Sequence, residues 1–142
     1  MTNWQDAGVI RRLLTTPAPW AVVGLSANAE RTAYRIGRYL RDHLGMTIVP
    51  VNLRGEATLG EPGYFRLADV PGSIAVVDCF VNSQRVGAVV DDAIAEKDRL
   101  GIRAVWLQLG VIDHDAARRA HAAGLDVVMD TCPAMEAPAL GL

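Results

Sequence analysis

Short apolar runs alternate with amphipathic stretches along most of the chain. Each run holds five to seven mostly apolar residues, which is typical of strands buried on both faces of a sheet. In the stretches between them, apolar residues recur every three or four positions, which predicts helices with one buried side. The predicted strands are Ala21–Leu25, Met46–Val51, Ile74–Phe80, Ile102–Leu107 and Leu125–Met129, and the predicted helices are Asn3–Leu14, Ala33–Leu44, Ser83–Leu100 and Asp113–Ala123.

Glycines mark the ends of three predicted helices. Gly45, Gly101 and Gly124 each lie between a helix and the next strand, where glycine can adopt the left-handed conformation that ends a helix. Strands and helices that alternate in this way form right-handed βαβ units with parallel strands. The sequence therefore predicts a Rossmann-like α/β fold, a single-domain, doubly wound, five-stranded parallel sheet with helices on both faces.

The length of 142 residues fits one domain, and no linker or repeat divides the chain. We expect an N-terminal helix and lead-in over residues 1–19, a Rossmann-like domain over residues 20–136 and a C-terminal tail over residues 137–142. The residues from 130 onward are compatible with a short helix or with coil. A loop from Leu53 to Ser73 is long for a connection, and we expect it to cover something.

Charge and composition argue against several classes of function. A net charge of −2 gives no reason to expect a basic face for nucleic acid, and no apolar run approaches the roughly 20 residues of a membrane helix. The N-terminal residues do not resemble a signal peptide, and Cys79 and Cys132 lack the spacing of metal ligands. We therefore expect a cytoplasmic protein that binds neither nucleic acid nor membrane. No metal is expected at Asp113, His114 and Asp115 either, because acidic residues at a helix start favour capping.

In a doubly wound sheet, ligands bind beyond the carboxyl ends of the strands, near the point where the strand order reverses. This rule selects the residues that follow each predicted strand. They include hydroxyls, amides, arginines and glycines, but no paired carboxylates, no Ser-His-Asp order and no Walker loop. The sequence therefore predicts a binding site and no catalytic residues.

The loop after the first predicted strand is the most informative of these segments. Gly24 permits a ligand to approach the backbone, and the following helix directs a partial positive charge at the same place, which favours phosphate. Arg31 and Arg35 can add charged hydrogen bonds. Ser26 and Asn28 could instead only form turns, and the fingerprint G-x-G-x-x-G is absent. The residue types alone leave both interpretations open.

Four segments of the sequence resemble one protein family. The segments "VVGLSANAERTAYRIGRYL", "IVPVN", "VWLQLG" and "AAGLDVVMDTC" are similar, in order and spacing, to the small stand-alone CoA-binding proteins with a Rossmann-like fold. They are also similar to the CoA-binding domains of succinyl-CoA synthetase and of ADP-forming acyl-CoA synthetases. The resemblance extends from about Trp20 to Glu136.

The resemblance implies a site for CoA or an acyl-CoA. It implies that the loop from Gly24 to Tyr34 holds the diphosphate, and that the adenosine lies beside the end of the second strand. The pantetheine arm would then lie along the residues after the fourth strand. The implied residues are Gly24, Ser26, Asn28, Arg31 and Tyr34 for the diphosphate, Val51 and Asn52 for the adenosine, Phe80 beside the ligand, Gln108, Leu109 and Gly110 for the pantetheine, and Cys132 near the floor or exit of the pocket.

Two departures from the family pattern weaken this expectation. Family members often carry arginine just after the third strand, where this chain reads Cys79-Phe80-Val81-Asn82. They also tend to carry D-R-C and a later E-H, where this chain has D-T-C and E-A. Each lost charged hydrogen bond would weaken binding by about 1–3 kcal/mol, although Arg54 or Arg85 could compensate.

The sequence therefore predicts a CoA- or acyl-CoA-binding protein without autonomous catalysis, acting as a homodimer or beside a partner enzyme subunit. The alternative is an NAD(P)-dependent or other nucleotide-dependent enzyme, or a regulatory subunit, on the same fold. The missing glycine fingerprint argues against that alternative. So does the end of the second strand, where Val51 and Asn52 stand instead of the acidic residue that holds a free ribose. A purely structural interaction protein is the third interpretation.

Overall fold

The five apolar runs form five strands of one parallel sheet in a computed structural model that describes residues 3–142. The strand order is β2-β1-β3-β4-β5, and every neighbouring pair is parallel. Because β2 and β3 flank β1 on opposite sides, the strand order reverses between β1 and β3. The strands are β1 (Pro19–Val23), β2 (Thr47–Val51), β3 (Val76–Cys79), β4 (Ala104–Leu107) and β5 (Asp126–Met129).

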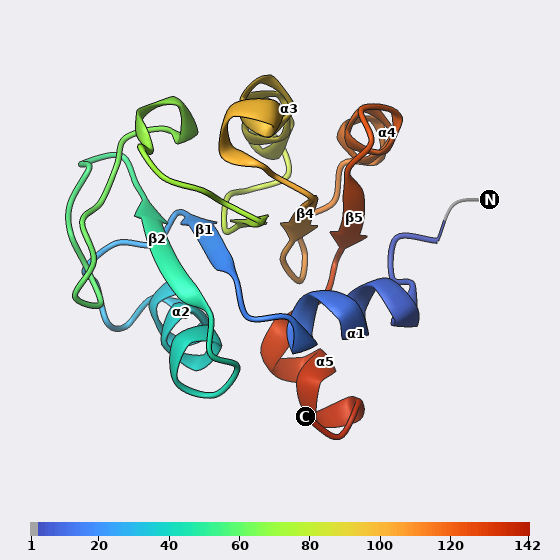
Figure 1. The fold of residues 1–142 in the computed structure, drawn as a ribbon, viewed down its shortest axis with the longest axis horizontal. Coiled ribbons are helices and arrows are strands. Elements are labelled where there is room, and N and C mark those ends of the chain that lie inside the picture. Colours follow the sequence, from blue (N-terminus) through green and yellow to red (C-terminus); the bar gives the residue numbers. More distant parts are fainter. Residues whose placement is uncertain (1–2) are drawn as a thin grey trace.

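Helices cover both faces of this sheet (Figure 1). Three helices pack on one face, and two helices with a short 3-10 turn pack on the other. The predicted doubly wound fold is therefore confirmed. The first group is α1 (Ala7–Thr15), α2 (Thr32–Asp42) and α5 (Pro133–Ala139), and the second is α3 (Val86–Leu100), α4 (His114–Ala122) and η1 (Leu67–Asp69).

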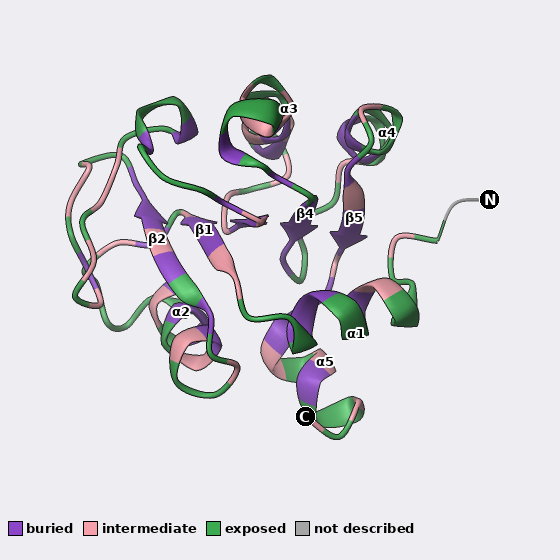
Figure 2. Cartoon of the chain, in the orientation of Figure 1, coloured by how far each residue is buried: buried purple, intermediate pink, exposed green. Residues whose placement is uncertain are grey.

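The strands are mostly apolar because each is covered on both faces (Figure 2), with Asp78 of β3 as a fully buried exception. Every residue of β3 and β4 is buried. On the side of α1, α2 and α5, the rings of Trp20 and Trp106 pack with their centroids 5.7 Å apart. The indole N–H of Trp106 donates to the carbonyl of Thr131 at 2.9 Å, which ties β4 to the segment that leads into α5.

Several boundaries differ from the predicted ones for local reasons. The first helix begins at Ala7 rather than Asn3, because the Asp6 carboxylate caps it by accepting from the Val9 N–H at 3.0 Å. The helix expected from Ser83 begins at Val86, since Asn82 closes a turn by accepting from the Arg85 N–H at 3.0 Å. The C-terminal residues form α5, which runs across the boundary expected at residue 136.

The long connection between β2 and β3 is held by specific contacts. Tyr64 forms a parallel bridge with Val51, which extends the edge of the sheet. Further along, the Arg99 guanidinium donates to the carbonyl oxygens of Val70 at 2.7 Å and Leu67 at 3.0 Å. Tyr64 thus holds the first part of the loop at the carboxyl end of β2, and Arg99 holds the η1 segment against the end of α3. Within residues 3–142, no helix combines the length and the apolar character that crossing a membrane requires.

Candidate functional site

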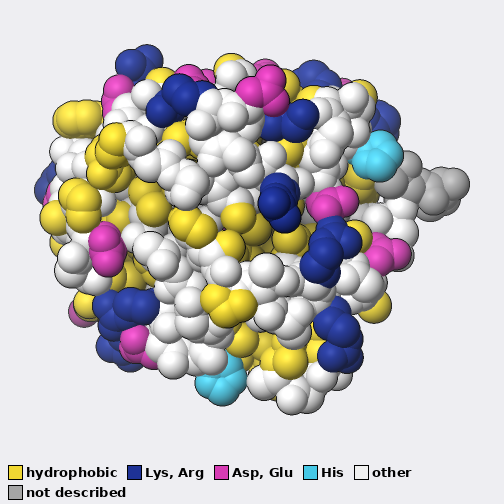
Figure 3. All heavy atoms as spheres, in the orientation of Figure 1, with side chains coloured by type: hydrophobic (Ala, Val, Ile, Leu, Met, Phe, Trp, Pro, Cys, Tyr) yellow, Lys and Arg dark blue, Asp and Glu magenta, His cyan; other side chains and the backbone are white. Residues whose placement is uncertain are grey.

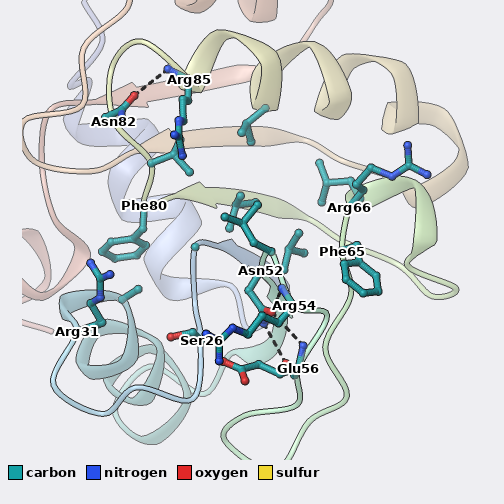
Figure 4. A pocket seen from close by; sticks show the side chains of 18 of the residues that line it. Ser26, Arg31, Asn52, Arg54, Glu56, Phe65, Arg66, Phe80, Asn82 and Arg85 are labelled. Carbon is teal, nitrogen blue, oxygen red and sulfur yellow. Dashed lines mark hydrogen bonds between the residues drawn. The ribbon is translucent and has the colours of Figure 1, made fainter.

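A cavity of about 1180 Å³ lies at the carboxyl ends of β1, β2 and β3 (Figure 4). Its walls come from the loop after β1, the start of α2, the long loop after β2 and the start of α3. The volume is somewhat above the range of about 300–1,000 Å³ that is typical of small-molecule sites. Seven of the predicted residues line it: Gly24, Ser26, Asn28, Arg31, Val51, Asn52 and Phe80.

Gly24 is required where β1 passes the end of β3. Its φ is +99°, and a Cβ atom at this position would lie 2.4 Å from the carbonyl oxygen of Phe80. Its N–H donates to the Val51 carbonyl at 2.8 Å. The sequence suggested that glycine is needed here so that a ligand can approach the backbone. In the structure, the Phe80 backbone already leaves no room for a side chain.

The polar residues of the first loop build the loop and also line the cavity. The Ser26 hydroxyl accepts from the Asn28 N–H at 3.2 Å, and the Asn28 side chain accepts from the Glu30 N–H at 3.0 Å. Both residues nevertheless form part of the cavity wall. The turn-forming interpretation is thus correct for these side chains, and it does not exclude contact with a ligand.

The helix N-termini at the cavity differ from those of α1 and α4, although α5 also begins without a side-chain cap. Asp6 caps α1 and Asp113 caps α4, each through its carboxylate. At α2 and α3 the capping positions are Arg31 and Arg85, and neither side chain makes a capping hydrogen bond. Both of these arginines line the cavity. Because the first N–H groups of a helix lack partners within the helix, α2 directs unpaired donors and partial positive charge toward this region. At α3 the N–H groups of Val86 and Ala88 are already bonded to the carbonyls of Asn82 and Arg85, so this helix adds mainly partial positive charge.

Four arginines surround the cavity and give it a positive character. Among residues 3–142, Arg31, Arg54 and Arg85 form no ion pair, whereas five of the arginines elsewhere do. Arg66 pairs only with Asp69, at 3.8 Å. The guanidinium groups around the cavity are therefore available for an anionic ligand.

Charges of both signs are mixed on the face of the molecule drawn in Figure 3. Lys and Arg side chains alternate there with Asp and Glu side chains. Neither sign of charge forms a continuous field on that face. The arginines that line the cavity therefore favour an anionic ligand there.

Asn52 supports the cavity from behind. Its side-chain amide donates to the carbonyl oxygens of Leu25 at 3.0 Å and Glu56 at 2.9 Å. Its side-chain oxygen accepts from the N–H groups of Arg54 and Glu56, both at 3.0 Å. The side chain is 8% exposed, and its two donors and two acceptor positions are all used. Asn52 thus joins the loop after β1 to the loop after β2.

The long loop after β2 adds residues that the sequence did not single out. Leu53 and Phe65 line the cavity and are 88% and 61% exposed. Arg66 and Glu56 lie on the same wall, and the Glu56 carboxylate accepts from the Ala27 N–H at 3.1 Å. The unusual length of this loop was the only signal for them, because their positions follow no periodic pattern.

Six predicted residues do not line this cavity. Tyr34 packs against the core on the α2 side, and the Arg35 guanidinium contacts the Thr32 hydroxyl at 3.4 Å. Beyond β4, Leu109 is 59% exposed and the Gly110 N–H donates to Asp130 at 2.7 Å. The remaining two, Gln108 and Cys132, are buried.

Gln108 and Cys132 belong to a buried polar region beside the cavity. The Gln108 amide donates to the Asp78 carboxyl at 2.5 Å. Burial raises the pKa of Asp78 to about 8, although the hydrogen bond from Gln108 opposes the shift. Burial also raises the pKa of the Cys132 thiol, against the effect of hydrogen bonds from the Ala134 and Met135 backbone. Cys132 is therefore a neutral thiol, which is a poor nucleophile.

Comparisons with known proteins agree with the fold. A family model described as a CoA binding domain matches residues 18–138. A hypothetical protein from Pyrococcus horikoshii OT3 has a solved structure with a TM-score of 0.86 and 34% identity, over 96% of this chain and 93% of that one. The uncharacterized protein YneT of Bacillus subtilis is 29% identical over 123 residues, 87% of each chain.

The fold also occurs as part of a larger enzyme. An acetyl-coenzyme A synthetase from Candidatus Korarchaeum cryptofilum, solved with phosphate and ADP, matches with a TM-score of 0.67 and 25% identity. The match covers 82% of this chain but only 26% of the synthetase.

Among the described residues, no group of three or more His, Cys, Asp or Glu side chains is arranged to hold a metal ion.

Proposed function

Since this chain belongs to the CoA-binding domain family, we propose that it binds CoA or an acyl-CoA in the cavity above β1 and β3, without catalysis of its own. One observation carries the proposal. The two long helices without a side-chain cap both begin at this cavity, and four arginines line it. CoA carries a diphosphate and a separate 3′-phosphate, so it needs positive charge at more than one point.

The proposed orientation follows from the positions of these charges. The diphosphate binds at the start of α2, where Arg31 and the first N–H groups of the helix act together. Arg54 and Arg85 bind the 3′-phosphate, in place of the arginine that this chain lacks after β3. The adenosine lies beside Val51 and the long loop, and the pantetheine arm passes Phe80 toward Leu109.

The absence of catalysis is inferred from the residues that line the cavity. Its two acidic side chains, Glu56 and Asp92, come from the long loop and from α3. No nucleophile with an adjacent base lines it, and the Asp78 carboxyl and the Cys132 thiol lie in the buried core beside it. We propose a cytoplasmic role in holding or sensing the cofactor, as a homodimer or beside an enzyme subunit.

Calorimetric titration with CoA, dephospho-CoA and NAD tests the proposal. CoA should bind at least about tenfold more tightly than NAD, which corresponds to about 1.4 kcal/mol. Dephospho-CoA should fall between them, and its disadvantage should shrink at high salt because exposed charges are screened. Arg85→Gln should weaken CoA binding, whereas Arg118→Gln, which changes an arginine paired with Asp115 on α4, should not. If CoA does not bind, the proposal is wrong.

A nucleotide with a free ribose diol, such as NAD, is the second candidate. It is favoured by Glu56, which supplies to the cavity the carboxylate that the end of β2 lacks. NAD binding as tight as that of CoA would establish this candidate in place of the first.

A further inference from the structure

Glu56 is a carboxylate in a cavity that otherwise favours anions. Its backbone is fixed from both sides, because Asn52 accepts from its N–H and donates to its carbonyl. The carbonyl also packs so closely on Gly63 that a Cβ atom there would lie 1.9 Å away. The side chain therefore starts from a rigid turn, and it reaches across to the loop after β1.

The two carboxylate oxygens of Glu56 have different surroundings. Oε1 accepts from the Ala27 N–H at 3.1 Å. Oε2 has no hydrogen bond within the described part of the chain, and no arginine there lies within ion-pair distance of the carboxylate. An ionised carboxylate can only accept hydrogen bonds. Oε2 is therefore free of protein donors, and the half-buried side chain can offer it to a donor group on a bound ligand.

Phosphate is excluded at this point of the cavity. The Ala27 N–H already donates to the Glu56 carboxylate. A phosphate group bound to the same N–H would lie next to that carboxylate, and the two negative charges would repel each other. The diphosphate must therefore bind further along, toward Arg31 and the start of α2, and the 3′-phosphate must point away from Glu56, toward Arg54 and Arg85. A hydroxyl group has no such conflict, because it can donate to Oε2.

We propose that Glu56 accepts a hydrogen bond from the 2′-hydroxyl of the bound nucleotide and makes the site selective for ribonucleotides over 2′-deoxyribonucleotides. This inference rests on the proposed function, since it takes the ligand to be an adenine nucleotide with its phosphates at the arginines. It fixes the ribose between the loop after β1 and the turn at Asn52. The base then lies toward Leu53 and Phe65, the exposed apolar side chains of that wall.

Two probes isolate the hydroxyl group. Adenosine 3′,5′-bisphosphate and its 2′-deoxy counterpart differ by one oxygen atom and carry the same phosphates. Calorimetric titration of the unaltered protein should give about tenfold tighter binding of the ribonucleotide, the effect of one hydrogen bond to a charged acceptor. Glu56→Ala should bind both probes equally. Glu56→Gln, which keeps an acceptor for Ala27 and for the hydroxyl, should retain part of the preference.

Controls separate this inference from the proposed function and from misfolding. Asp92→Asn removes the other acidic side chain of the cavity and should keep the full preference, and circular dichroism with thermal unfolding checks each variant. CoA binding together with equal affinity for the two probes, or with a preference that survives in Glu56→Ala, would overturn only the role of Glu56. Failure of CoA and of both probes to bind would overturn the inference and the proposed function together.

Discussion

Replacing Asp78 by Asn should make the protein increasingly more stable than the unaltered chain as the pH rises. Asp78 lies in β3 and is fully buried. One carboxyl oxygen accepts from Gln108, and the other has no partner within the described structure. Burial raises the pKa of this carboxyl to about 8. Asn has nearly the same shape and keeps the acceptor for Gln108, but it cannot ionise.

The size of the effect follows from the two pKa values of Asp78. The folded protein keeps the Asp78 proton up to about pH 8, whereas the unfolded chain releases it near a pKa of 3.8. Between these values the folded state binds more protons, so its free energy of unfolding falls by about 1.4 kcal/mol for each pH unit gained. Below a pH of about 3.8, Asp78 is protonated in both states and the free energy of unfolding is not reduced by its ionisation. At neutral pH, the free energy of unfolding is about 4 kcal/mol lower for this reason.

Urea unfolding of three proteins between about pH 5 and pH 8 measures this effect. The free energy of unfolding of Asp78→Asn, minus that of the unaltered protein, should increase steadily across the range. Asp98→Asn, which changes a fully exposed carboxylate, should show no such trend. If the curves of Asp78→Asn and of the unaltered protein run parallel, Asp78 does not carry a buried proton and the reasoning fails.

Two further substitutions test how the cavity walls are held. Gly24→Ala should lower the free energy of unfolding by about 1–3 kcal/mol more than Gly60→Ala does. Both glycines have a positive φ, but only a side chain at Gly24 would meet the Phe80 backbone. Equal losses of stability in urea unfolding would show that this clash does not occur. Asn52→Ala should cost about 3 kcal/mol and weaken CoA binding, since it leaves one buried and three partly buried hydrogen bonds unmade. Asn52→Asp, which keeps the two acceptor positions but places a carboxylate oxygen against the Leu25 and Glu56 carbonyls, should not recover this loss at neutral pH, and a recovery would contradict the account.

The sequence by itself determined the fold, because the evidence for it is local. Helical and strand periodicity each span only a few residues, and glycine ends α3 at Gly101 with a φ of +78°. The alternation of such elements admits few arrangements besides a parallel sheet with right-handed crossovers. Four of the five strands were predicted too long, and the first was predicted two residues late. Burial alone does not extend a ladder: Ile74 is buried, yet its N–H pairs with the carbonyl of Leu100 outside the sheet.

The sequence also located half of the candidate site. The rule that ligands bind at the carboxyl ends of the strands, near the reversal of strand order, selected Gly24, Arg31 and Phe80, and all three line the cavity. The rule did not distinguish the strands around the reversal from β4. Residues after β4 were therefore included as well, although Gln108 turns inward to Asp78.

The tertiary structure decided which side chains complete the cavity. Glu56, Phe65 and Arg66 come from the long loop, whose course depends on contacts between residues far apart in the sequence. The Arg99 guanidinium, for example, is bonded to a carbonyl 29 residues away in the chain, and Tyr64 pairs with the end of β2. Such contacts leave no periodic pattern, because each depends on where the sheet places two distant segments. Local patterns can therefore predict the layers of this protein, but the chemistry of its cavity is determined only when those segments meet.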